Sequence, residues 1–385
     1  MTAMKSRLRT PLPFAFIVLM GSGVAAAESA EVATFIPSHK SKQVLLAAAD
    51  VPPAATYLAF PAVLTLGGEV LVSFKRGRSH AGDSGAVLEL LRFDPASEKV
   101  TSHQVLAEIS DKIMQMGEWV RFPNGDIANY IDAQQKQAPT RIGLRMVRST
   151  DGGKTFGPVE RVGAVDGVEY GYAFEAITEG KRTWMLVMTF ANLTGGSSVY
   201  SPRPASGSVD VILSDDNGMT WRFVRNLTKE FGDIPINESS FTRHGDDFIV
   251  TARGYDNRQW LMQTDGDFKL QRKVDLTRAN AFIRSYVGRP RVFTRDGGWY
   301  LLGRNYTDKG PMRLSLFRFD PASFRITKHV LLDNSAGENV TDGYYAAPYW
   351  QERAGRIFFN TVTYKGLSKR SPDIVRLEFD WEEIR

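Results

Sequence analysis

Cysteine is absent from this chain of 385 residues, and histidine is scarce, with five residues. Without cysteine the protein has no disulfide bond, no thiol nucleophile and no lipid attached to an N-terminal cysteine. The fold must be held together by its core, and 43% hydrophobic with 24% charged residues is typical of a globular protein. HExxH, clustered-cysteine and EF-hand spacings are also missing, and the glycine-rich stretches do not open helices, so we expect no metal and no cofactor.

Long apolar runs are lacking beyond the start of the chain. There, Lys5, Arg7 and Arg9 precede the run PFAFIVLMGSGVAAA, which ends in small residues. This pattern predicts a signal peptide over residues 1–27 and hence an exported protein, periplasmic or secreted; an uncleaved N-terminal anchor is the alternative. The run is short for a bilayer and no later segment is long enough, so we expect no membrane span.

A strongly basic charge is lacking once this segment is removed. The formal net charge falls from +5 to +2, because the segment contains three basic residues and no acidic ones. No basic stripe or basic helix stands out elsewhere in the sequence. We therefore expect no nucleic-acid partner.

Internal repetition is what the sequence does have. Six segments each consist of a strand-like apolar run, a glycine-containing turn and a second strand-like run. Their turn glycines are 52 to 65 residues apart, the length that a four-stranded sheet and its loops occupy. These glycines are Gly68, Gly125, Gly180, Gly245, Gly297 and Gly355.

The elements between these turns indicate an all-β protein. β-Branched and aromatic residues alternate between Gly, Asp and Asn turns, and long amphipathic helices are hard to find. Six sheets arranged radially form a six-bladed β-propeller of four-stranded antiparallel blades, whose closed ring limits exposed sheet edges. A two-domain sandwich is the alternative, but no linker rich in Pro, Gly or Ser interrupts the series. We predict a single propeller domain over residues 28–385, and a monomer.

Two related octets mark one position in the repeats: STDGGKTF at 149–156 and SDDNGMTW at 214–221. Each follows the third strand-like run of its repeat, at a tight turn before the last strand. We expect Asp151 to accept hydrogen bonds from the backbone N–H groups of its own turn, and Phe156 and Trp221 to pack beneath. A turn that recurs in successive blades cannot converge on one substrate, so the octets belong to the scaffold.

The octets resemble the Asp-boxes, or BNR repeats, of the sialidase (neuraminidase) superfamily, with the pattern Ser-x-Asp-x-Gly-x-Thr-Trp or Phe. The resemblance implies a six-bladed propeller with a site on loops around the central axis. Family sialidases use a tyrosine nucleophile assisted by a glutamate, an aspartic acid as acid/base and three arginines that hold the substrate carboxylate. The same scaffold also serves other glycan enzymes and binding proteins, so function depends on the site residues.

The segment NESSFTRHGDDFIVTAR is similar to the family's Asn-Glu-Ser strand, which is followed by a glycine turn and an arginine. The resemblance implies that Glu238 is the assisting glutamate and Arg253 one carboxylate clamp; a solvated rim residue is the alternative for Glu238. In KRGRSHAGDSGAV the family's acid/base aspartate corresponds to Asp83, which could equally be a turn residue. In TDGYYAAPYW the nucleophile corresponds to Tyr345, with Tyr344 as the alternative register.

The arginines depart from the family pattern. The family's first clamp stands two residues before a proline, and in YLAFPAV that position is Ala59. Replacing a bidentate donor by a methyl group removes a charge-assisted contact with a carboxylate, which weighs against ordinary sialic acid cleavage. We therefore place Arg78, Arg253, Arg304 and Arg313 in the substrate-binding set. Further arginines that could compensate are Arg76, Arg289 and Arg291.

These residues predict an exo-acting, retaining glycoside hydrolase that acts on an acidic sugar of a glycan. A polysaccharide lyase is a second hypothesis, in which His80 and a tyrosine abstract the proton next to a uronate carboxylate. A glycan-binding propeller without chemistry is the third. The aromatic residues that would line such a binding site by stacking on sugar faces are Trp119, Tyr170, Tyr172 and Trp350.

Overall fold

The computed structural model describes residues 32–38, 40–135, 141–189, 208–280, 282–283, 285–305, 311–368 and 370–385. The predicted signal peptide lies outside these residues. The described helices are short: η1 (Ala48–Asp50), η2 (Pro53–Ala55), α1 (Leu227–Glu230), α2 (Leu276–Ala279) and α3 (Trp381–Ile384). No helix in these ranges has the length and apolar character needed to cross a bilayer.

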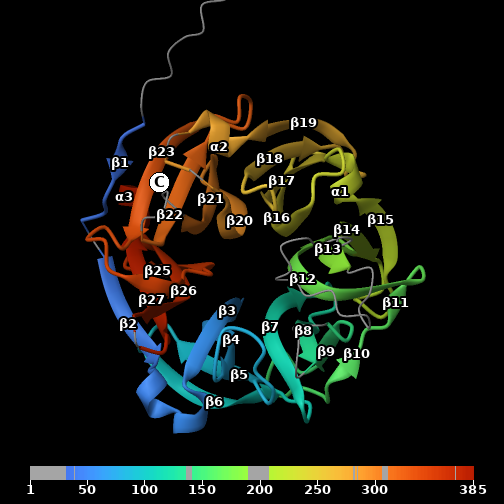
Figure 1. Cartoon of the computed structure of the whole chain (residues 1–385), viewed down its shortest axis with the longest axis vertical. Helices are drawn as coiled ribbons and strands as arrows, with labels where there is room; N and C mark the ends of the chain where they lie inside the picture. The colour runs from blue at the N-terminus through green and yellow to red at the C-terminus, as the bar shows by residue number, and fades with distance from the viewer. Residues whose placement is uncertain are drawn as a thin grey trace, which may run out of the picture. The chain divides into compact units, whose positions relative to one another are not determined.

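Six antiparallel blades stand around a central axis in the unit Val32–Arg385, as the all-β prediction required (Figure 1). Blade 1 contains β3 (Tyr57–Leu66), β4 (Glu69–Gly77), β5 (Val87–Asp94) and β6 (Lys99–Ala107). Blade 2 contains β7 (Lys112–Arg121), β8 (Ile127–Gln135), β9 (Arg145–Ser149) and β10 (Glu160–Arg161). Blade 3 contains β11 (Ala164–Val165), β12 (Val168–Glu179), β13 (Arg182–Thr189), β14 (Ser208–Ser214) and β15 (Arg222–Asn226).

The remaining blades follow in chain order. Blade 4 contains β16 (Ile236–His244), β17 (Asp247–Gly254), β18 (Gln259–Thr264) and β19 (Leu270–Asp275). Blade 5 contains β20 (Val287–Arg295), β21 (Gly298–Asn305), β22 (Arg313–Phe319) and β23 (Ile326–Asp333). Blade 6 contains β24 (Val340–Gly343), β25 (Ala347–Arg353), β26 (Arg356–Leu367) and β27 (Asp373–Asp380).

The N-terminal part of this unit closes the ring. β2 (Lys40–Leu46) pairs antiparallel with β27 and becomes the outer strand of blade 6, while β1 (Thr34–Phe35) pairs parallel with β23 of blade 5. Figure 1 shows these two blue strands beside the orange and red strands of blades 5 and 6. β2 and β1 thereby cover the edges of β27 and β23 and become the outermost strands of blades 6 and 5.

The six turn glycines each lie in the hairpin between an inner strand and the next long strand of the same blade, which in blade 3 is β12–β13 and in blade 6 is β25–β26. All six have φ between 57° and 107°, a region that other residues resist. The repeat boundaries inferred from their spacing are therefore confirmed.

The two octets form the predicted turns. Ser149 Oγ donates to Asp151 and accepts the N–H of Gly153 at 2.8 Å, while Asp151 accepts the N–H of Thr155 at 3.0 Å. These hydrogen bonds, chiefly those from Thr155, hold the pKa of Asp151 well below its usual range. The Phe156 ring packs against another aromatic ring of blade 2, with centroids 5.6 Å apart. The second octet repeats the pattern, so both octets are structural turns on the side of the hairpins.

Candidate functional site

The inner strand of every blade is irregular on the side away from its glycine hairpin. Such bulges bend a strand and turn side chains in directions that a regular pleat does not allow. The ring therefore directs polar side chains toward the axis at this end. The register shifts lie at Ala59–Ala62, Met114–Met116, Tyr170–Tyr172, Ile236–Ser239, Gly288–Arg291 and Val340–Asp342.

A bulky residue in the left-handed region lies inside two of these irregular segments and just beyond a third, between β24 and β25. Phe60, Arg289 and Tyr344 have φ of 59°, 45° and 65°. Each such residue costs on the order of 1–3 kcal/mol and persists only where the surrounding structure enforces it. The three residues belong to blades 1, 5 and 6, which are neighbours in the closed ring. The strained backbone therefore surrounds one sector of the axis.

Tyr345 lies in this sector, between β24 and β25. Its phenol donates a hydrogen bond to Oε1 of Glu238 in β16. The neighbouring Tyr344 has a different partner: its Oη donates to Oδ2 of Asp333 at 2.7 Å. Burial and the negative charge of Glu238 raise the pKa of Tyr345 well above its ordinary value, so its phenol is neutral.

Glu238 is buried beneath this phenol. Its Oε2 accepts Nη1 of Arg253 at 3.0 Å and the backbone N–H of Arg289 at 2.9 Å. Burial alone would raise the pKa of Glu238, but the charges of Arg253 and Arg304 outweigh it and lower the pKa to about 2. The carboxylate is ionised at neutral pH and can accept the proton of Tyr345.

Arg253 and Arg304 occupy corresponding places at the ends of β17 and β21. The Arg304 guanidinium lies 4.8 Å from the ring centroid of Tyr345, and its Nη1 donates to the carbonyl of Gly343 at 3.3 Å. The Arg253 guanidinium stacks 3.7 Å from the ring centroid of Tyr286. Two cations thus flank the tyrosine and the glutamate.

Ala59 is buried in β3 and pairs with Lys75 of β4. Lys75 Nζ donates to the carbonyls of Ser79 and His80, at 2.9 and 3.2 Å, and to Oε1 of Gln115 at 3.0 Å. Burial lowers the pKa of Lys75 to about 8. The ammonium group of Lys75, which lies next to Ala59, therefore holds the β4–β5 loop.

Arg289 and Arg291 form ion pairs with carboxylates near the axis of the propeller. Both guanidinium groups pair with Glu118 of β7, Arg291 at 2.8 Å, and Arg291 also lies 3.3 Å from Glu175 of β12. Residues of this cluster line an axial cavity of about 270 Å³ toward the hairpin side. These two arginines are thus matched by internal carboxylates.

Asp83 and Arg78 lie together in the β4–β5 loop. Oδ2 of Asp83 accepts the backbone N–H groups of Arg78 and Ser79, and Oδ1 accepts Nε of Arg78 at 3.3 Å. The Arg78 side chain is otherwise 64% exposed.

Arg313 begins β22 in blade 5. Burial, and to a smaller extent the charge of Arg313, lowers the pKa of His329 to about 4. The contacts of Tyr345 and Glu238 thus join them to Arg253 and Arg304, while Asp83 and Arg78 contact each other.

A second polar cluster adjoins Tyr345 and includes residues that the sequence did not single out. Nδ1 of His80 lies 2.6 Å from Oδ2 of Asp342, which also accepts the phenol of Tyr57. Oδ1 of Asp342 accepts the phenol of Tyr364 at 2.9 Å and lies 3.6 Å from Nη1 of Arg304. The only sequence signal for Asp342 is that it stands three residues before Tyr345.

The aromatic residues considered for sugar stacking are mostly packed. Trp119, Tyr170 and Tyr172 are at most 5% exposed, and the phenol of Tyr170 donates to Asp210 at 2.8 Å. Trp119 and Trp350 line the axial cavity rather than the site around Tyr345. Most of this set therefore serves the packing of blades.

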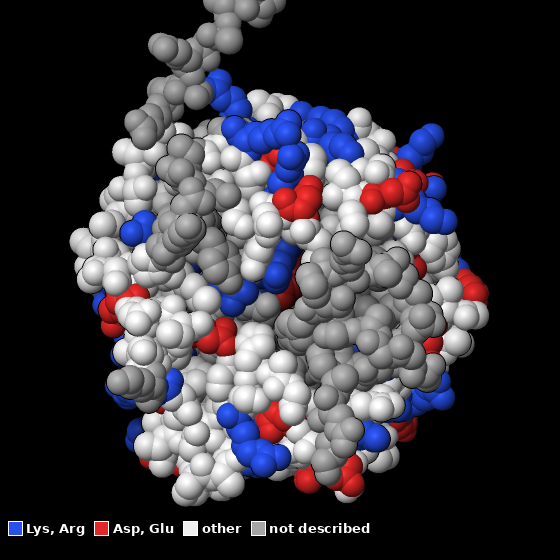
Figure 2. Space-filling view, viewed as in Figure 1, with Lys and Arg blue, Asp and Glu red and all other residues white. Residues whose placement is uncertain are grey.

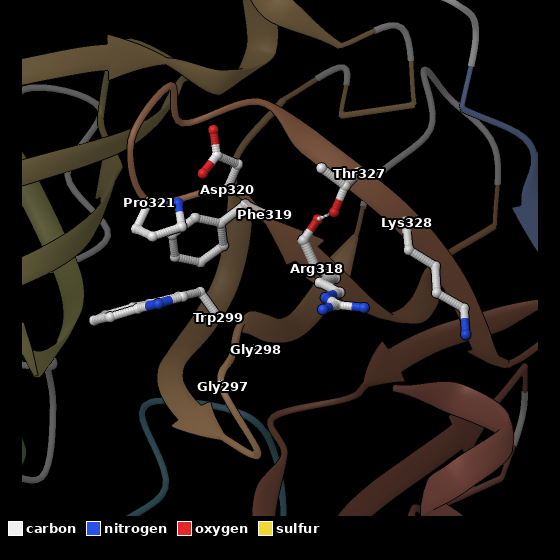
Figure 3. Close-up of a pocket in the computed structure, with 9 residues that line it drawn as sticks. All are labelled: Gly297, Gly298, Trp299, Arg318, Phe319, Asp320, Pro321, Thr327 and Lys328. Atoms are coloured by element: carbon white, nitrogen blue, oxygen red, sulfur yellow. Dashed lines mark hydrogen bonds between the residues drawn. The ribbon is translucent and has the colours of Figure 1, made fainter.

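Charged side chains and one further pocket are also found on the surface of the propeller. Figure 2 shows basic and acidic side chains together near the centre of the ring. A surface pocket of about 490 Å³ lies instead at the hairpin turns of blade 5, where Trp299, Asp320 and Lys328 contribute to its lining (Figure 3). Within the described ranges, no group of three or more His, Asp or Glu side chains is arranged to hold a metal ion.

Comparisons with known proteins establish the fold. A protein of unknown function from Dyadobacter fermentans superposes with a TM-score of 0.66 at 15% identity, over 89% of this chain and 98% of that one. Trypanosoma rangeli sialidase in complex with sialic acid gives 0.57 at 10% identity, over 91% of this chain and 60% of that one. Penicillium chrysogenum α-L-arabinanase with arabinobiose gives 0.55 at 10% identity, over 90% and 99%.

At these identities the likeness concerns the propeller fold alone. No family model matches the sequence, and no curated protein matches it. The fold resembles that of sialidases and of an arabinanase, which are different glycosidases. Function must therefore be inferred from the side chains of this chain.

Proposed function

We propose that the protein is a retaining glycoside hydrolase that acts on an acidic sugar of a glycan. The observation that carries this proposal is the buried hydrogen bond between Tyr345 and the ionised Glu238, with Arg253 and Arg304 beside them. A neutral phenol attacks next to an anionic substrate without the repulsion that a carboxylate nucleophile would suffer. The structural neighbour from Trypanosoma, described as a sialidase with sialic acid, supports the same substrate class.

In the first step, Tyr345 Oη forms a bond to the anomeric carbon while Glu238 Oε1 takes the phenolic proton. The bond from the anomeric carbon to the leaving oxygen breaks, and that oxygen takes a proton from the acid/base group. In the second step, water attacks the anomeric carbon and returns a proton to that group. The Tyr345–carbon bond then breaks, and Tyr345 recovers its proton from Glu238.

The substrate carboxylate has two candidate ligands in this scheme. Arg253 and Arg304 flank Tyr345, and both cations are partly offset by Glu238 and Asp342. Position 59 contributes no guanidinium, because its residue is alanine. An acidic sugar bound by two arginines, rather than the three that the sialidase resemblance implies, is what this arrangement supports.

The nucleophile is tested by two neighbouring tyrosines. We expect Tyr345→Phe to abolish release of an acidic sugar, because it deletes the attacking oxygen, and to lose about 2 kcal/mol of stability, because its buried phenol donates to ionised Glu238. Tyr344→Phe is the matched control: it should keep activity but lose about 2 kcal/mol of stability, since the buried phenol donates to ionised Asp333. Mass spectrometry of products from sialylated and uronate-containing glycans measures the first effect, and urea unfolding the second.

Activity that survives in Tyr345→Phe would contradict the mechanism. Two other outcomes point elsewhere. An unsaturated uronate product that absorbs in the ultraviolet would indicate a lyase, and tight binding without any product would indicate a glycan-binding propeller.

A further inference from the structure

His80 and Asp342 form a pair at the edge of the Tyr345 site. The His80 side chain is 37% exposed and that of Asp342 is 18% exposed. The His80 ring packs edge-on against Phe60 with centroids 5.0 Å apart, and Phe60 packs against Tyr345 with centroids 5.4 Å apart. One aromatic ring therefore separates an accessible imidazole from the proposed nucleophile.

The loop that carries His80 is held from two blades. Its backbone carbonyl accepts Nε2 of Gln115 at 2.7 Å, from blade 2, and Nζ of Lys75 at 3.2 Å, from blade 1. The ring itself is held by Asp342 of blade 6 and approached by the phenol of Tyr57, whose Oη lies 3.2 Å from Nδ1. An imidazole fixed at both backbone and ring is positioned for a directed proton transfer.

Asp83, in the same loop, is engaged differently. Its two carboxylate oxygens accept the backbone N–H groups of Arg78 and Ser79 and the guanidinium of Arg78, and its side chain is 1% exposed. These bonds close the turn that presents His80. The loop therefore offers the imidazole, not the carboxylate, to a group entering from solvent.

On the basis of the proposed function, we propose that His80 is the acid/base group of the reaction and that Asp342 is its positioning residue. Nδ1–H of His80 donates to Asp342, which leaves Nε2–H directed to the leaving oxygen. In the first step Nε2 gives its proton to that oxygen, and the imidazolium becomes neutral. In the second step Nε2 accepts a proton from the attacking water, and the imidazolium is restored.

The experiment compares two leaving groups on the same acidic sugar. Glycosides of N-acetylneuraminic acid and of glucuronic acid are each prepared with lactose and with 4-methylumbelliferone, which departs without protonation. We expect His80→Gln to slow lactose release by about 100-fold or more, the usual contribution of a general acid. The first burst of umbelliferone should stay within about tenfold of the unaltered protein, because the attack of Tyr345 does not need His80.

The second step gives an independent signal. Without a base to activate water, the glycosyl group should remain on Tyr345 in His80→Gln. Intact-protein mass spectrometry should then detect an added glycosyl mass after incubation with the umbelliferyl glycoside. The adduct should be absent from the double variant with Tyr345→Phe.

Three further variants separate catalysis from structure. Asp342→Asn keeps the imidazole but should show the same difference between leaving groups, whereas a purely structural role would slow both equally. Asp83→Asn should slow both equally, because it loosens the loop. His103→Gln on the outer strand β6 is the matched control: Nε2 of His103 lies 2.8 Å from Glu89 of β5, and both rates should be unchanged.

The outcomes of these experiments distinguish failure of the His80 role from failure of the proposed function. Equal slowing of both substrates in His80→Gln, or a difference between them in Asp83→Asn instead, would overturn the role of His80 while the proposed function stands. If the unaltered protein cleaves none of these glycosides, the proposed function fails and the acid/base role fails with it. If His80→Gln does not fold, the leaving-group comparison in Asp342→Asn decides.

Discussion

The carboxylate of Glu238 is buried yet ionised, because the charges of Arg253 and Arg304 outweigh the cost of burial. Of the two, Arg253 lowers the pKa of Glu238 more. We expect Arg253→Met to raise this pKa, so that the acid limb of the kcat profile moves up by about 1–3 pH units. The sign follows from the proposed role of Glu238 as the base: the carboxylate must be ionised, so activity falls as pH drops through its pKa.

The measurement is kcat per folded molecule at saturating substrate from pH 2 to 8. Arg253→Lys is the control, since it retains the charge beside Glu238: its KM should rise but its acid limb should stay in place. An acid limb that does not move in Arg253→Met would show that Glu238 is not the group whose ionisation limits the reaction.

Local sequence was sufficient to place together those candidate residues that belong to one hairpin or one short motif. Glu238 and Arg253 lie on the paired strands β16 and β17, so their spacing along the chain reflects a spatial contact. The contact between His80 and Asp342 spans 262 residues and forms only when blades 1 and 6 meet. No periodicity or short motif predicts a contact over such a distance in the sequence, so the cluster of His80 and Asp342 could be identified only from the folded structure.

At the scale of elements, the octet turns also connect neighbouring blades. Gly218 in the turn of blade 3 has φ of 77°, and a Cβ there would lie 2.3 Å from the ring of Phe122 in blade 2. Gly152 has a similar φ of 73°, but a Cβ there would meet nothing within 4 Å. Gly218 thus serves close packing as well as turn geometry, as does its counterpart Gly153 in the first octet, where a Cβ would lie 2.8 Å from Leu66.

This difference predicts two unequal substitutions. Gly152→Ala should cost about 1 kcal/mol for the left-handed backbone alone. Gly218→Ala should cost about 1–3 kcal/mol more, because the added methyl group overpacks against a buried ring. Urea midpoints measure the difference, and kcat per folded molecule should be unchanged in both. A loss of kcat in folded Gly218→Ala would contradict the scaffold role of the octet.

The elements themselves were well predicted where glycine hairpins delimit them, but the closing strand was not. β2 (KSKQVLL) has no clear alternation, since four of its seven residues are exposed and one is buried. Its partner β27 lies at the other end of the sequence. The strand exists through its backbone pairing with β27, which forms only when the two ends of the chain meet and is not encoded in the pattern of the segment itself.

At the scale of the whole molecule, Asp333 joins the ends of the ring. It ends β23 in blade 5 and pairs with Lys40 of the closing strand β2 and, at 2.9 Å, with Lys365 of β26. Burial opposes its ionisation, but Lys40 and Lys365 lower the pKa of Asp333 to about 2. The folded pKa is thus below the unfolded value of about 3.9, so the stabilisation is complete above about pH 4 and is lost as pH falls toward 2.

We therefore expect Asp333→Asn to lower the free energy of unfolding by about 3 kcal/mol at pH 6, because it leaves the buried ammonium of Lys365 with only the half-exposed carboxylate of Glu338 as its counter-charge. The difference from the unaltered protein should shrink at pH 3, where the native carboxyl begins to lose its advantage. Glu338→Gln is the matched control: it also pairs with Lys365, but its side chain is 47% exposed, and the loss should be about 0.5 kcal/mol. Urea unfolding at the two pH values measures both. A difference for Asp333→Asn that is equal at pH 6 and pH 3 would mean that packing, not charge, closes the ring at this point.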